Sequence, residues 1–578
     1  MKLFRPFILS LCCLVPVTGF SLDRNAFTFT HYDLRLQIEP QQQRLGVRGT
    51  LTLRNDSLIA QKNAVLQISS SLDWRSIKLN GQAVSYVSQL YTSDLDHTGG
   101  LSEAIVSFPR EIPPEQTVEL EVGYEGVILP DTTRLTRIGV PESTAKHSDW
   151  DQISPEFTAV RGVGYVTWYP IATEAASLSE GSTVFATIGA WKFRERGSDL
   201  RAQVCLTAAA AENIPTILVN DVPMGDSSGG SFGGPVADSR TSCGEHNFSN
   251  LGFTVPTFVS ASFVRSDAPS VLSYALEHHG QSAAVFTQAA QAVMPFITEW
   301  FGQPKHPVRV VDIQDTEAAP FESGLMLLTP FENTDPKLAE MMLAHQLTHA
   351  AFPSSRPWIA EGLAHFAQAL WREQQAGRHA ALDYMGSHLP ALAAAEKATA
   401  AQKDSARFES MISTSEEEYY RSKAMFIWWM LRDMVGESVL KKAIAAYRAE
   451  NDNEPSYVQK LIETPSHRDL EWFFDDWVYR DRGLPDFRVV SAYTRQMLKG
   501  AYLATISVEN QGAAGAEVPV MVRLEGGEVT SKLVVHAKST AVLRVEVPSQ
   551  PREIVVNDGS VPETNTGNNA FQIQETRQ

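Results

Sequence analysis

The hydrophobic pattern of this 578-residue chain changes twice along its length. Residues 27–127 alternate apolar and polar positions in short runs separated by turn residues, which is typical of half-buried antiparallel strands. Between about 268 and 485, apolar residues recur at spacings of three and four, which indicates helices. Beyond Pro485 the alternation returns. The chain is therefore expected to be a multidomain α+β protein, with β-rich domains on either side of a helical one.

We expect five segments from these changes of pattern. In chain order they are a leader at 1–21, a β-rich N-terminal domain at 22–265, a helical domain at 266–485, an immunoglobulin-like β-sandwich at 486–561 and a loosely ordered tail at 562–578. The N-terminal domain is expected to hold β-structure at 187–193 and 254–263, and a surface loop at the Gly/Ser-rich run 225–234. The length leaves each domain enough residues to bury a core.

The leader and the cysteines indicate export. Lys2 and Arg5 precede an apolar run at 6–17, and small residues follow at 19 and 21, as in a secretory signal peptide. Two of the four cysteines lie in this leader, which leaves Cys205 and Cys243 in the mature chain. An even pair in an oxidising compartment favours a disulfide over two buried thiols. We therefore expect a periplasmic or extracellular protein in which these two cysteines are bonded.

Charge and hydropathy exclude several partners. The chain has 49 basic and 67 acidic residues and a net charge of −18, so its field repels nucleic acid and anionic membrane surfaces. After the leader there is no run of about 18 or more apolar residues that could span a membrane. We therefore expect no nucleic-acid partner and no transmembrane segment after signal removal.

One predicted helix in the middle of the chain carries two histidines. Asp335 is a suitable N-cap, Pro336 fits the first helical position, and Pro353 ends the helix. His345 and His349 are four residues apart, so both imidazoles lie on one face at a separation suited to two ligands of a tetrahedral zinc ion. Two histidines on an apolar helix can also be a hydrogen-bonded core feature, so a metal site needs a third ligand.

The next predicted helix offers two candidates for that ligand. Its apolar positions 359, 363, 366 and 370 form a stripe that would face the core, which turns Glu361 and His365 toward another side. Either side chain could complete a zinc site with the two histidines, and the pattern alone does not choose between them.

Seven short motifs along the chain resemble those of a known family. They are HYDLRL at 31–36, VGYEG at 122–126, PFESGLM at 320–326, HQLTH at 345–349, WIAEG at 358–362, YRSKA at 420–424 and GLP at 483–485. In this order they are similar to the first strand, the end of the first β unit, the G-A-M-E-N segment, H-E-x-x-H, W-L-N-E-G, Y-E-K-G-A and the closing G-x-P of the gluzincin zinc aminopeptidases, typified by aminopeptidase N. The resemblance covers most of the chain.

The resemblance implies an architecture and an activity. The fold would be an N-terminal β-saddle, an α-helical thermolysin-like catalytic domain with a small β element near 308–313, and the C-terminal β-sandwich. The activity would be that of a zinc metallopeptidase, a hydrolase that binds one Zn²⁺ ion and removes amino-terminal residues from a peptide or protein substrate. An adhesion protein with an incidental helical insert would not require the motifs to keep this order.

Carried over to this sequence, the resemblance makes His345, His349 and Glu361 the zinc ligands, with water at the fourth position. The segment between His349 and Glu361 holds 11 residues, fewer than in the family. This shortening keeps His365 open as an alternative third ligand.

The same resemblance assigns the substrate contacts. Glu322, in the segment that also holds Gly324, would bind the free α-amine of the substrate, because a carboxylate pairs with an ammonium group. Tyr420 would donate a hydrogen bond to the oxyanion that forms on the scissile carbonyl. The match is out of step by one residue depending on how Lys423 is aligned, so the adjacent Tyr419 is an alternative.

Gln346 stands where the family has the glutamate between its two histidines. That glutamate takes a proton from water and passes it to the leaving amine, whereas a glutamine amide is essentially non-basic. General-base catalysis contributes typically about 10²–10⁴-fold to the rate. The sequence therefore predicts either a metallopeptidase of weak activity or a pseudoenzyme that keeps the fold and the metal and binds peptides.

Overall fold

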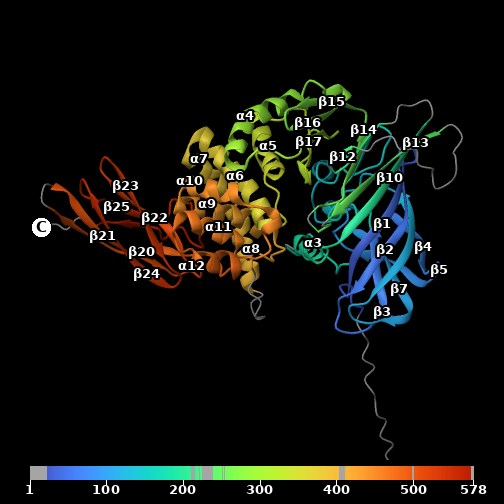
Figure 1. Cartoon of the computed structure of the whole chain (residues 1–578), viewed down its shortest axis with the longest axis horizontal. Coiled ribbons are helices and arrows are strands. Elements are labelled where there is room, and N and C mark those ends of the chain that lie inside the picture. Colours follow the sequence, from blue (N-terminus) through green and yellow to red (C-terminus); the bar gives the residue numbers. More distant parts are fainter. Residues whose placement is uncertain are drawn as a thin grey trace, which may run out of the picture.

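The computed structural model describes residues 22–573, except 182, 210–214, 221, 224–238, 250, 253, 402–409 and 498–499. The expected leader, the Gly/Ser-rich run 225–234 and the end of the expected tail lie outside the described residues. The molecule is elongated, and its β-rich N-terminal part, helical part and C-terminal β-sandwich follow one another along the long axis (Figure 1). None of the described helices is long and apolar enough to cross a membrane.

Three sheets form the N-terminal part. The largest has seven strands in the order β13-β10-β1-β2-β8-β4-β5, in which β1 is antiparallel to β2 and parallel to β10. The alternating sequence pattern accounts for the strands, since Tyr32, Leu34 and Leu36 of β1 are fully buried. The three sheets contain β1 (Phe27–Glu39), β2 (Arg44–Asn55), β4 (Leu72–Leu79), β5 (Gln82–Ala83), β8 (Thr117–Val127), β10 (Asp199–Ala209) and β13 (Ser239–Ser249); β3 (Gln61–Ser69), β6 (Ser85–Thr92) and β7 (Gly100–Ile112); and β9 (Phe157–Val160), β11 (Thr216–Val219), β12 (Val222–Pro223) and β14 (Phe258–Ala261).

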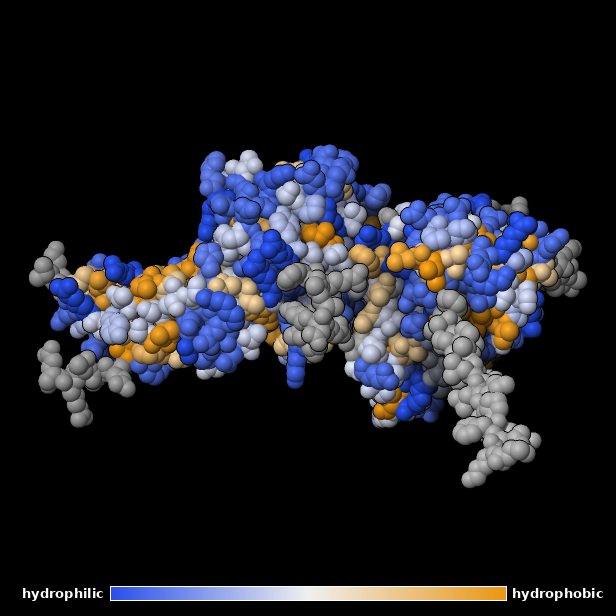
Figure 2. All heavy atoms as spheres, turned by 90° about the horizontal axis from the view of Figure 1, so that it is seen from below, coloured by the Kyte–Doolittle hydropathy of each residue, from blue (hydrophilic) through white to orange (hydrophobic). Residues whose placement is uncertain are grey.

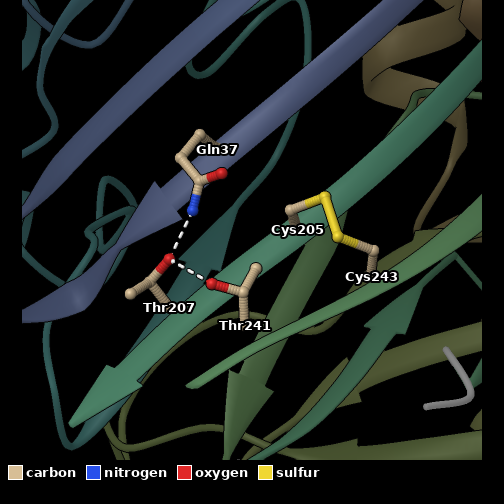
Figure 3. The surroundings of a disulfide bond; sticks show 5 residues. All are labelled: Gln37, Cys205, Thr207, Thr241 and Cys243. Carbon is tan, nitrogen blue, oxygen red and sulfur yellow. Dashed lines mark hydrogen bonds between the residues drawn. A yellow bond between two sulfur atoms is a disulfide. The ribbon is translucent and has the colours of Figure 1, made fainter. Parts of the chain in front are cut away.

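A disulfide ties the edge strand of the largest sheet to its neighbour. Cys205 of β10 and Cys243 of β13 lie opposite each other in the ladder, with a sulfur–sulfur distance of 2.11 Å. Beside them, the Gln37 amide of β1 donates to the Thr207 hydroxyl, which lies 3.2 Å from the hydroxyl of Thr241 (Figure 3). Covalent and polar links therefore hold three neighbouring strands together at this edge.

A helix, α3 (Thr183–Arg194), occupies the stretch 187–193 that we expected to be part of the β-structure. Its apolar residues Val184, Ile188 and Trp191 recur at spacings of four and three and pack on the N-terminal core. A short apolar run fits both periods, and here packing decides for the helix. The helix lies on the side of the N-terminal part that faces the helical part (Figure 1), and two short helices precede it, α1 (Thr133–Thr136) and α2 (Glu142–Ala145).

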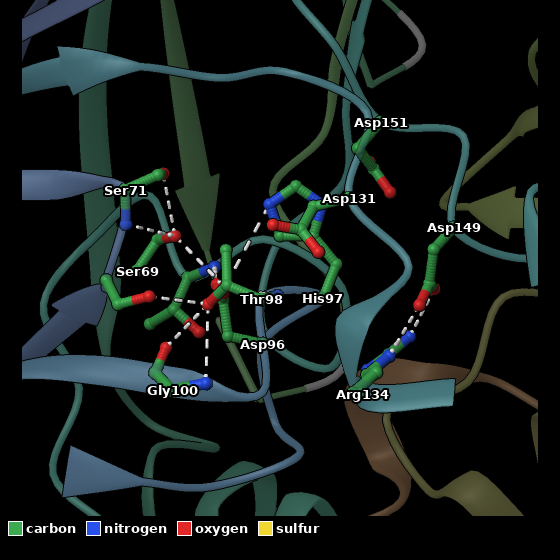
Figure 4. A network of polar contacts seen from close by, with 12 residues as sticks. Ser69, Ser71, Asp96, His97, Thr98, Gly100, Asp131, Arg134, Asp149 and Asp151 are labelled. Carbon is green, nitrogen blue, oxygen red and sulfur yellow. Dashed lines mark hydrogen bonds and ion pairs between the residues drawn. The ribbon is translucent and has the colours of Figure 1, made fainter. Parts of the chain in front are cut away.

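A buried polar network stabilises the loops of the N-terminal part. The Asp96 carboxylate accepts hydrogen bonds from the Thr98 hydroxyl and from the backbone N–H of Thr167, both at 2.8 Å. Arg134 donates two hydrogen bonds to Asp149, at 2.6 and 2.8 Å (Figure 4). Buried charged groups need a counter-ion or hydrogen-bond partners, which the network supplies to Asp96 and Asp149. The bond from the Thr167 backbone to Asp96 holds the loop that contains Thr167.

A five-stranded sheet opens the helical part. Its order is β15-β16-β17-β19-β18, with β16, β17 and β19 parallel and β18 antiparallel at the edge. The expected boundary at 265 falls inside β15, which pairs with β16 and so belongs to this sheet. The expected β element near 308–313 is its central strand, β17. The strands are β15 (Phe263–Ala268), β16 (Val271–Leu276), β17 (Val308–Asp312), β18 (Phe321–Ser323) and β19 (Met326–Thr329).

The helices pack around one apolar core that continues into the sandwich. Two segments, Tyr419–Lys423 and Asp475–Tyr479, are π-helical. The α-helices are α4 (Ala284–Phe301), α5 (Pro336–Ala351), α6 (Pro357–Ala376), α7 (Arg378–Gly386), α8 (Leu389–Ala401), α9 (Ala424–Val435), α10 (Glu437–Ala446), α11 (Tyr457–Ser466) and α12 (Glu471–Phe474).

The C-terminal sandwich has a three-stranded sheet, β20-β21-β24, and a four-stranded sheet, β23-β22-β25-β26. Strand β26 lies in the segment from 562 onward that we expected to be a loosely ordered tail. It pairs with β25 and forms the edge of the four-stranded sheet, so this part of the segment is ordered. The strands are β20 (Phe487–Gln496), β21 (Tyr502–Asn510), β22 (Ala516–Leu524), β23 (Gly527–Val535), β24 (Ser539–Val547), β25 (Glu553–Val556) and β26 (Ala570–Gln572).

Hydrophilic residues predominate on the face shown in Figure 2, and hydrophobic ones form small scattered groups there. Large exposed apolar side chains occur in the sandwich, such as Tyr493 and Val542, and in the N-terminal part, such as Leu58 and Leu90. Scattered apolar side chains are ordinary on a globular protein and carry no functional argument here.

Candidate metal centre

Helix α5 places the two predicted histidines side by side. Its N-cap Asp335 accepts hydrogen bonds from the backbone N–H groups of Lys337 and Leu338, at 2.8 and 3.1 Å, so the predicted start of the helix is confirmed. His345 and His349 lie one turn apart, and their Nε2 atoms are 3.1 Å from each other. Both imidazoles therefore present the same nitrogen to one point.

Helix α6 brings a carboxylate to that point. The stripe positions 359, 363, 366 and 370 are buried in the core, which turns Glu361 toward α5. Its two carboxylate oxygens lie 3.7 Å from the Nε2 of His345 and 3.5 Å from that of His349. The short connection between the helices is therefore long enough to bring Glu361 within reach of both histidines.

Strand β18 aims a second carboxylate at the histidines. Successive side chains of a strand point to opposite faces, so Phe321 and Ser323 share one face and Glu322 occupies the other. On the shared face, the ring of Phe321 meets that of Tyr165 edge-on at 5.2 Å, and the Ser323 hydroxyl donates to the Val255 carbonyl at 2.7 Å. The N-terminal part therefore holds one face of β18, and Glu322 points away from it.

Glu322 ends 3.1 Å from the Nε2 of His345. The ligand atoms of Glu322, His345 and His349 all lie within 4.8 Å of one another, which makes these residues a possible three-residue metal site. Zinc bonds of about 2.0–2.1 Å place tetrahedral ligand atoms about 3.3 Å apart. The separations around the Nε2 of His345, from 3.1 to 3.7 Å, bracket that value, so the two histidines and the carboxylates beside them lie at distances that suit a zinc ion.

The charges of the four side chains depend on one another. Burial opposes ionisation of both carboxyl groups, but His345 holds the pKa of Glu322, and Arg421 that of Glu361, below the ordinary value. Burial also opposes protonation of the histidines; Glu322 nevertheless raises the pKa of His345, whereas that of His349 is lowered. Both carboxylates are therefore ionised at neutral pH, the form in which they bind a cation.

Gln346 is buried on α5 between the two histidines. Neither its amide oxygen nor its amide nitrogen has a hydrogen-bond partner among the described residues. A buried polar group without a partner costs about 1–3 kcal/mol, so this amide suits a water molecule or a ligand group. The side chain is neutral and contributes no base.

The two candidate tyrosines, Tyr419 and Tyr420, both lie in the π-helical segment Tyr419–Lys423, but their surroundings differ. Tyr419 is buried in the core, with the ammonium of Lys423 5.1 Å from its ring. Burial, followed by the negative charges of Glu417 and Glu361, raises the pKa of Tyr420, although the positive charge of Arg421 acts in the opposite direction. Tyr420 is therefore the tyrosine that lies near the candidate metal centre, and its hydroxyl stays protonated.

Arg421 is a site residue that the sequence analysis missed. Its Nε donates to a Glu361 oxygen at 3.2 Å, and it also pairs with Glu417 one turn before it. The spacing of four between Glu417 and Arg421 was a signal for that second pair. The contact with Glu361, 60 residues away, has no local signature.

His365 lies next to the candidate centre without joining it. Its ring centroid is 4.9 Å from that of His345, and its Nδ1 is 3.5 Å from the Tyr384 hydroxyl, which donates to Gln368 at 2.7 Å. Burial, followed by the charge of His345, holds the pKa of His365 well below its ordinary value. In the described residues Glu361, and not His365, is the residue of α6 that lies beside both histidine nitrogens.

Gly324 forms the turn between β18 and β19 with a φ of +59°. This left-handed conformation favours glycine. The turn follows Glu322 directly, so it sets where the strand that carries this carboxylate ends.

No protein-family model matches the chain, and no curated protein matches it in sequence. Among solved structures, the chain is similar to Legionella pneumophila aminopeptidase A in complex with aspartic acid, with a TM-score of 0.57 and 13% identity, over 93% of this chain and 59% of that chain. The M1 zinc metallopeptidase from Deinococcus radiodurans matches with a TM-score of 0.42 and 15% identity, over 78% of this chain and 94% of that chain. A mutant of it bound to a Tyr-Ser-Ala substrate matches with a TM-score of 0.43 and 16% identity, over 80% and 96%. The chain thus spans 59% of the Legionella aminopeptidase and shares with it a mixed α/β, multidomain fold.

Proposed function

We propose that this protein is an exported zinc metallopeptidase of the gluzincin aminopeptidase type. The observation that carries the proposal is the convergence of two imidazole nitrogens and two ionised carboxylates at separations that suit one metal ion. The similarity of fold to an aminopeptidase supports the same activity. Zinc, when bound, polarises the scissile carbonyl and lowers the pKa of a water molecule.

His345, His349 and Glu361 would hold the zinc ion. One carboxylate oxygen of Glu361 lies 3.7 Å from the Nε2 of His345, and the other lies 3.5 Å from the Nε2 of His349. Glu322 contacts His345, at 3.1 Å. Glu322 would then bind the α-amine of the substrate, with which its ionised carboxylate forms a charge-assisted hydrogen bond. This pairing selects substrates with a free amino terminus.

Tyr420 and Gln346 would act on the reacting groups. The Tyr420 hydroxyl would donate a hydrogen bond to the scissile carbonyl oxygen as negative charge builds on it. Gln346 would orient the attacking water through its amide oxygen. Because an amide does not take up the proton, the reaction would lack the usual general base and run slowly.

A second candidate function is that of a pseudoenzyme that binds peptides. One observation favours it: the side chain of Gln346 is a neutral, buried amide that contributes no base. In this case zinc and peptide binding persist, but hydrolysis is absent.

Both candidate functions require bound zinc, so the zinc content of the purified protein tests them together. Elemental analysis of the mature protein after reconstitution should give one zinc ion per chain. The variants His345→Ala and Glu361→Gln should lose it, because each removes a ligand. His379→Ala is the matched control, since this histidine is exposed on α7. Zinc missing from the wild type, or undiminished in His345→Ala, would contradict the proposal.

Glu322→Gln separates the two carboxylates. We expect this variant to keep its zinc and to raise the KM for aminoacyl amides about 10–100-fold, because a hydrogen bond to a charged group is worth about 1.5–3 kcal/mol. The measurement is zinc-dependent release of the amino-terminal residue. Loss of zinc in Glu322→Gln with full zinc in Glu361→Gln would show that Glu322 is the zinc ligand and Glu361 the contact of the α-amine.

A further inference from the structure

His147 links the N-terminal part to the loop that leads into β18. It lies in the turn after α2, whereas residues 313–320 join β17 to β18, the strand that carries Glu322. The His147 Nδ1 lies 2.8 and 2.7 Å from the two carboxylate oxygens of Asp315, and its Nε2 lies 2.9 Å from an oxygen of Glu317. One imidazole of the N-terminal part therefore bridges two carboxylates of this loop.

The bridge requires a charged imidazole. An ionised carboxylate accepts hydrogen bonds but cannot donate them, so both ring nitrogens of His147 must carry a hydrogen. In a neutral imidazole one nitrogen is bare, and its lone pair would face a carboxylate oxygen. Histidine is the side chain whose charge ordinarily changes between pH 5 and 8, and the His147 side chain is 20% exposed, so it exchanges protons with solvent. The complete bridge is therefore present at the acid end of this range.

A cavity of about 430 Å³ lies beside the bridge and is lined by residues of both loops. Its lining residues with charged side chains are Lys146, His147, Asp315 and Glu317. Lys146 forms no ion pair among the described residues, so His147 is the cation that pairs with the two carboxylates. The amides of Gln152 and Gln314, 3.4 Å apart, make the one other side-chain hydrogen bond between residues 141–157 and 313–320 of the described chain. Few polar contacts therefore hold the loop here, and those of His147 are the shortest.

The loop transmits the bridge to the strand of the candidate site. The Asp315 carboxylate also accepts a hydrogen bond from the backbone N–H of Glu317 at 3.0 Å, and the Asp315 carbonyl accepts one from Ala318 at 3.3 Å, which forms a turn. Beyond this turn, Ala318 and Phe321 pack in one apolar cluster with residues of the N-terminal part. Glu322 follows Phe321 directly and points to the other face of β18. A change at Asp315 therefore acts on the segment that positions the Glu322 carboxylate.

We infer that His147 is a pH-dependent clasp that regulates substrate binding at the candidate site. This inference rests on the proposed function, in which Glu322 binds the α-amine of the substrate. When the imidazole is charged, the clasp holds the loop and keeps Glu322 in position for the amine. As the pH rises and the imidazole loses its proton, the loop is held less tightly, and the contribution of the clasp to substrate affinity is lost.

Hydrogen exchange of residues 313–323 tests the clasp without substrate. The exchange rates of wild type and His147→Gln are compared by mass spectrometry at pH 5.5 and at pH 8, because comparison at one pH cancels the intrinsic pH dependence of exchange. At pH 5.5 the variant should exchange about 2–5-fold faster, the effect of losing one partly exposed ion pair, and at pH 8 the two proteins should exchange alike. Equal rates at pH 5.5, or a difference that persists unchanged at pH 8, overturn the inference.

Two further variants show whether the effect passes through the clasp. Asp315→Asn should reproduce the effect of His147→Gln, and the double variant should add nothing, because both changes break the same contact. Additive effects overturn the inference. His31→Gln is the matched control, since it removes a histidine whose Nδ1 lies 2.7 Å from Asp199 in the largest sheet, and it should leave the exchange of residues 313–323 unchanged. Equal melting temperatures of the variants exclude general unfolding as the cause.

Binding of a substrate analogue tests the link to Glu322. The dissociation constant of a non-cleavable reduced-amide analogue of alanylglycinamide is measured by calorimetry on wild type and His147→Gln. The ratio of variant to wild type should be about 2–5 at pH 5.5 and about 1 at pH 8, since all other titrating groups are shared and cancel. A ratio of about 1 at pH 5.5, or no binding by either protein, overturns the inference. The measurement needs no turnover, so absence of zinc-dependent hydrolysis overturns only the proposed peptidase activity.

Discussion

Gln346 is the residue on which turnover depends most directly. It stands between the two histidines in the sequence, and its side chain is buried and has no hydrogen-bond partner among the described residues. Gln346→Glu changes an amide into a carboxylate of the same length, so it adds a base without new bulk. We expect it to raise zinc-dependent hydrolysis of aminoacyl amides by about 10²–10⁴-fold, the usual contribution of a general base. The measurement is kcat/KM over a panel of aminoacyl amides.

Two further variants show whether the gain arises as proposed. Adding Tyr420→Phe to Gln346→Glu should lower the restored activity, because the phenolic donor is removed. High wild-type turnover that is unaffected by Gln346→Ala would show that the base lies elsewhere. No gain in a zinc-loaded Gln346→Glu protein would favour the pseudoenzyme.

The site residues divide into those with and without a local sequence signature. His345 and His349 follow from a spacing of four on one helix, whereas the apolar stripe of the next helix left both Glu361 and His365 open. The contact of Arg421 with Glu361 has no such pattern, because the two residues lie 60 positions apart along the chain. Glu322 lies in one of the motifs, but the motif did not predict the contact of its carboxylate with His345. That contact depends on the position of strand β18.

At the scale of elements, capping and periodicity predicted α5 well and α3 not at all. Asp335 and Pro336 specify the start of α5, whereas α3 is a short apolar run whose helical period is decided by packing on the N-terminal core. The π-helical segment Tyr419–Lys423 was not predicted either. A π-turn accommodates one extra residue, which is the size of the offset found when Lys423 is aligned with the family motif.

The anchoring of β18 gives a prediction for this element. Phe321 contacts Tyr165, and the Ser323 hydroxyl donates to the Val255 carbonyl at 2.7 Å, so both anchors act on Glu322 from the opposite face. We expect Ser323→Ala to raise the KM for aminoacyl amides about fivefold, because one lost hydrogen bond is worth about 1 kcal/mol. The kcat should change little.

A double-mutant cycle separates positioning from general destabilisation. If Ser323 acts through Glu322, Ser323→Ala should have no further effect on KM in a Glu322→Gln background. Thr334→Ala, which removes a hydroxyl contact to the Pro330 carbonyl elsewhere in the helical part, is the control and should leave KM unchanged. Additive effects of Ser323→Ala and Glu322→Gln would exclude a positioning role.

At the scale of the whole molecule, the two changes of hydrophobic period predicted the order of β-rich, helical and β-rich parts. They could not predict which strands pair. Strand β1 lies parallel to β10 although His31 and its partner Asp199 are 168 residues apart, and a period of two carries no information about such partners. The long-range pairing is decided by the packed core and, at the β10–β13 edge, by the Cys205–Cys243 bond.

Glu195 links the stability of the whole chain to pH. It lies at the end of α3, is fully buried, and accepts hydrogen bonds from the Phe29 backbone at 3.3 Å and the Ser198 hydroxyl at 2.9 Å. Burial raises the pKa of this carboxyl from 4.5 to about 7. The folded chain therefore holds a proton between these values that the unfolded chain has already released. Its contribution to stability is complete below about pH 4.5 and is lost as the pH rises through about 7.

Glu195→Gln removes this titration and keeps an acceptor of similar shape. A pKa difference of about 2.5 corresponds to about 3 kcal/mol, so the variant should match the wild type below about pH 4.5 and exceed it by up to about 3 kcal/mol near pH 8. The measurement is the free energy of unfolding by urea across this range, in which the titrations of all other groups cancel between the two proteins. Glu450→Gln, at an exposed position, is the control and should follow the wild type. A constant difference between Glu195→Gln and wild type from pH 5 to pH 8 would show that Glu195 does not titrate in this window.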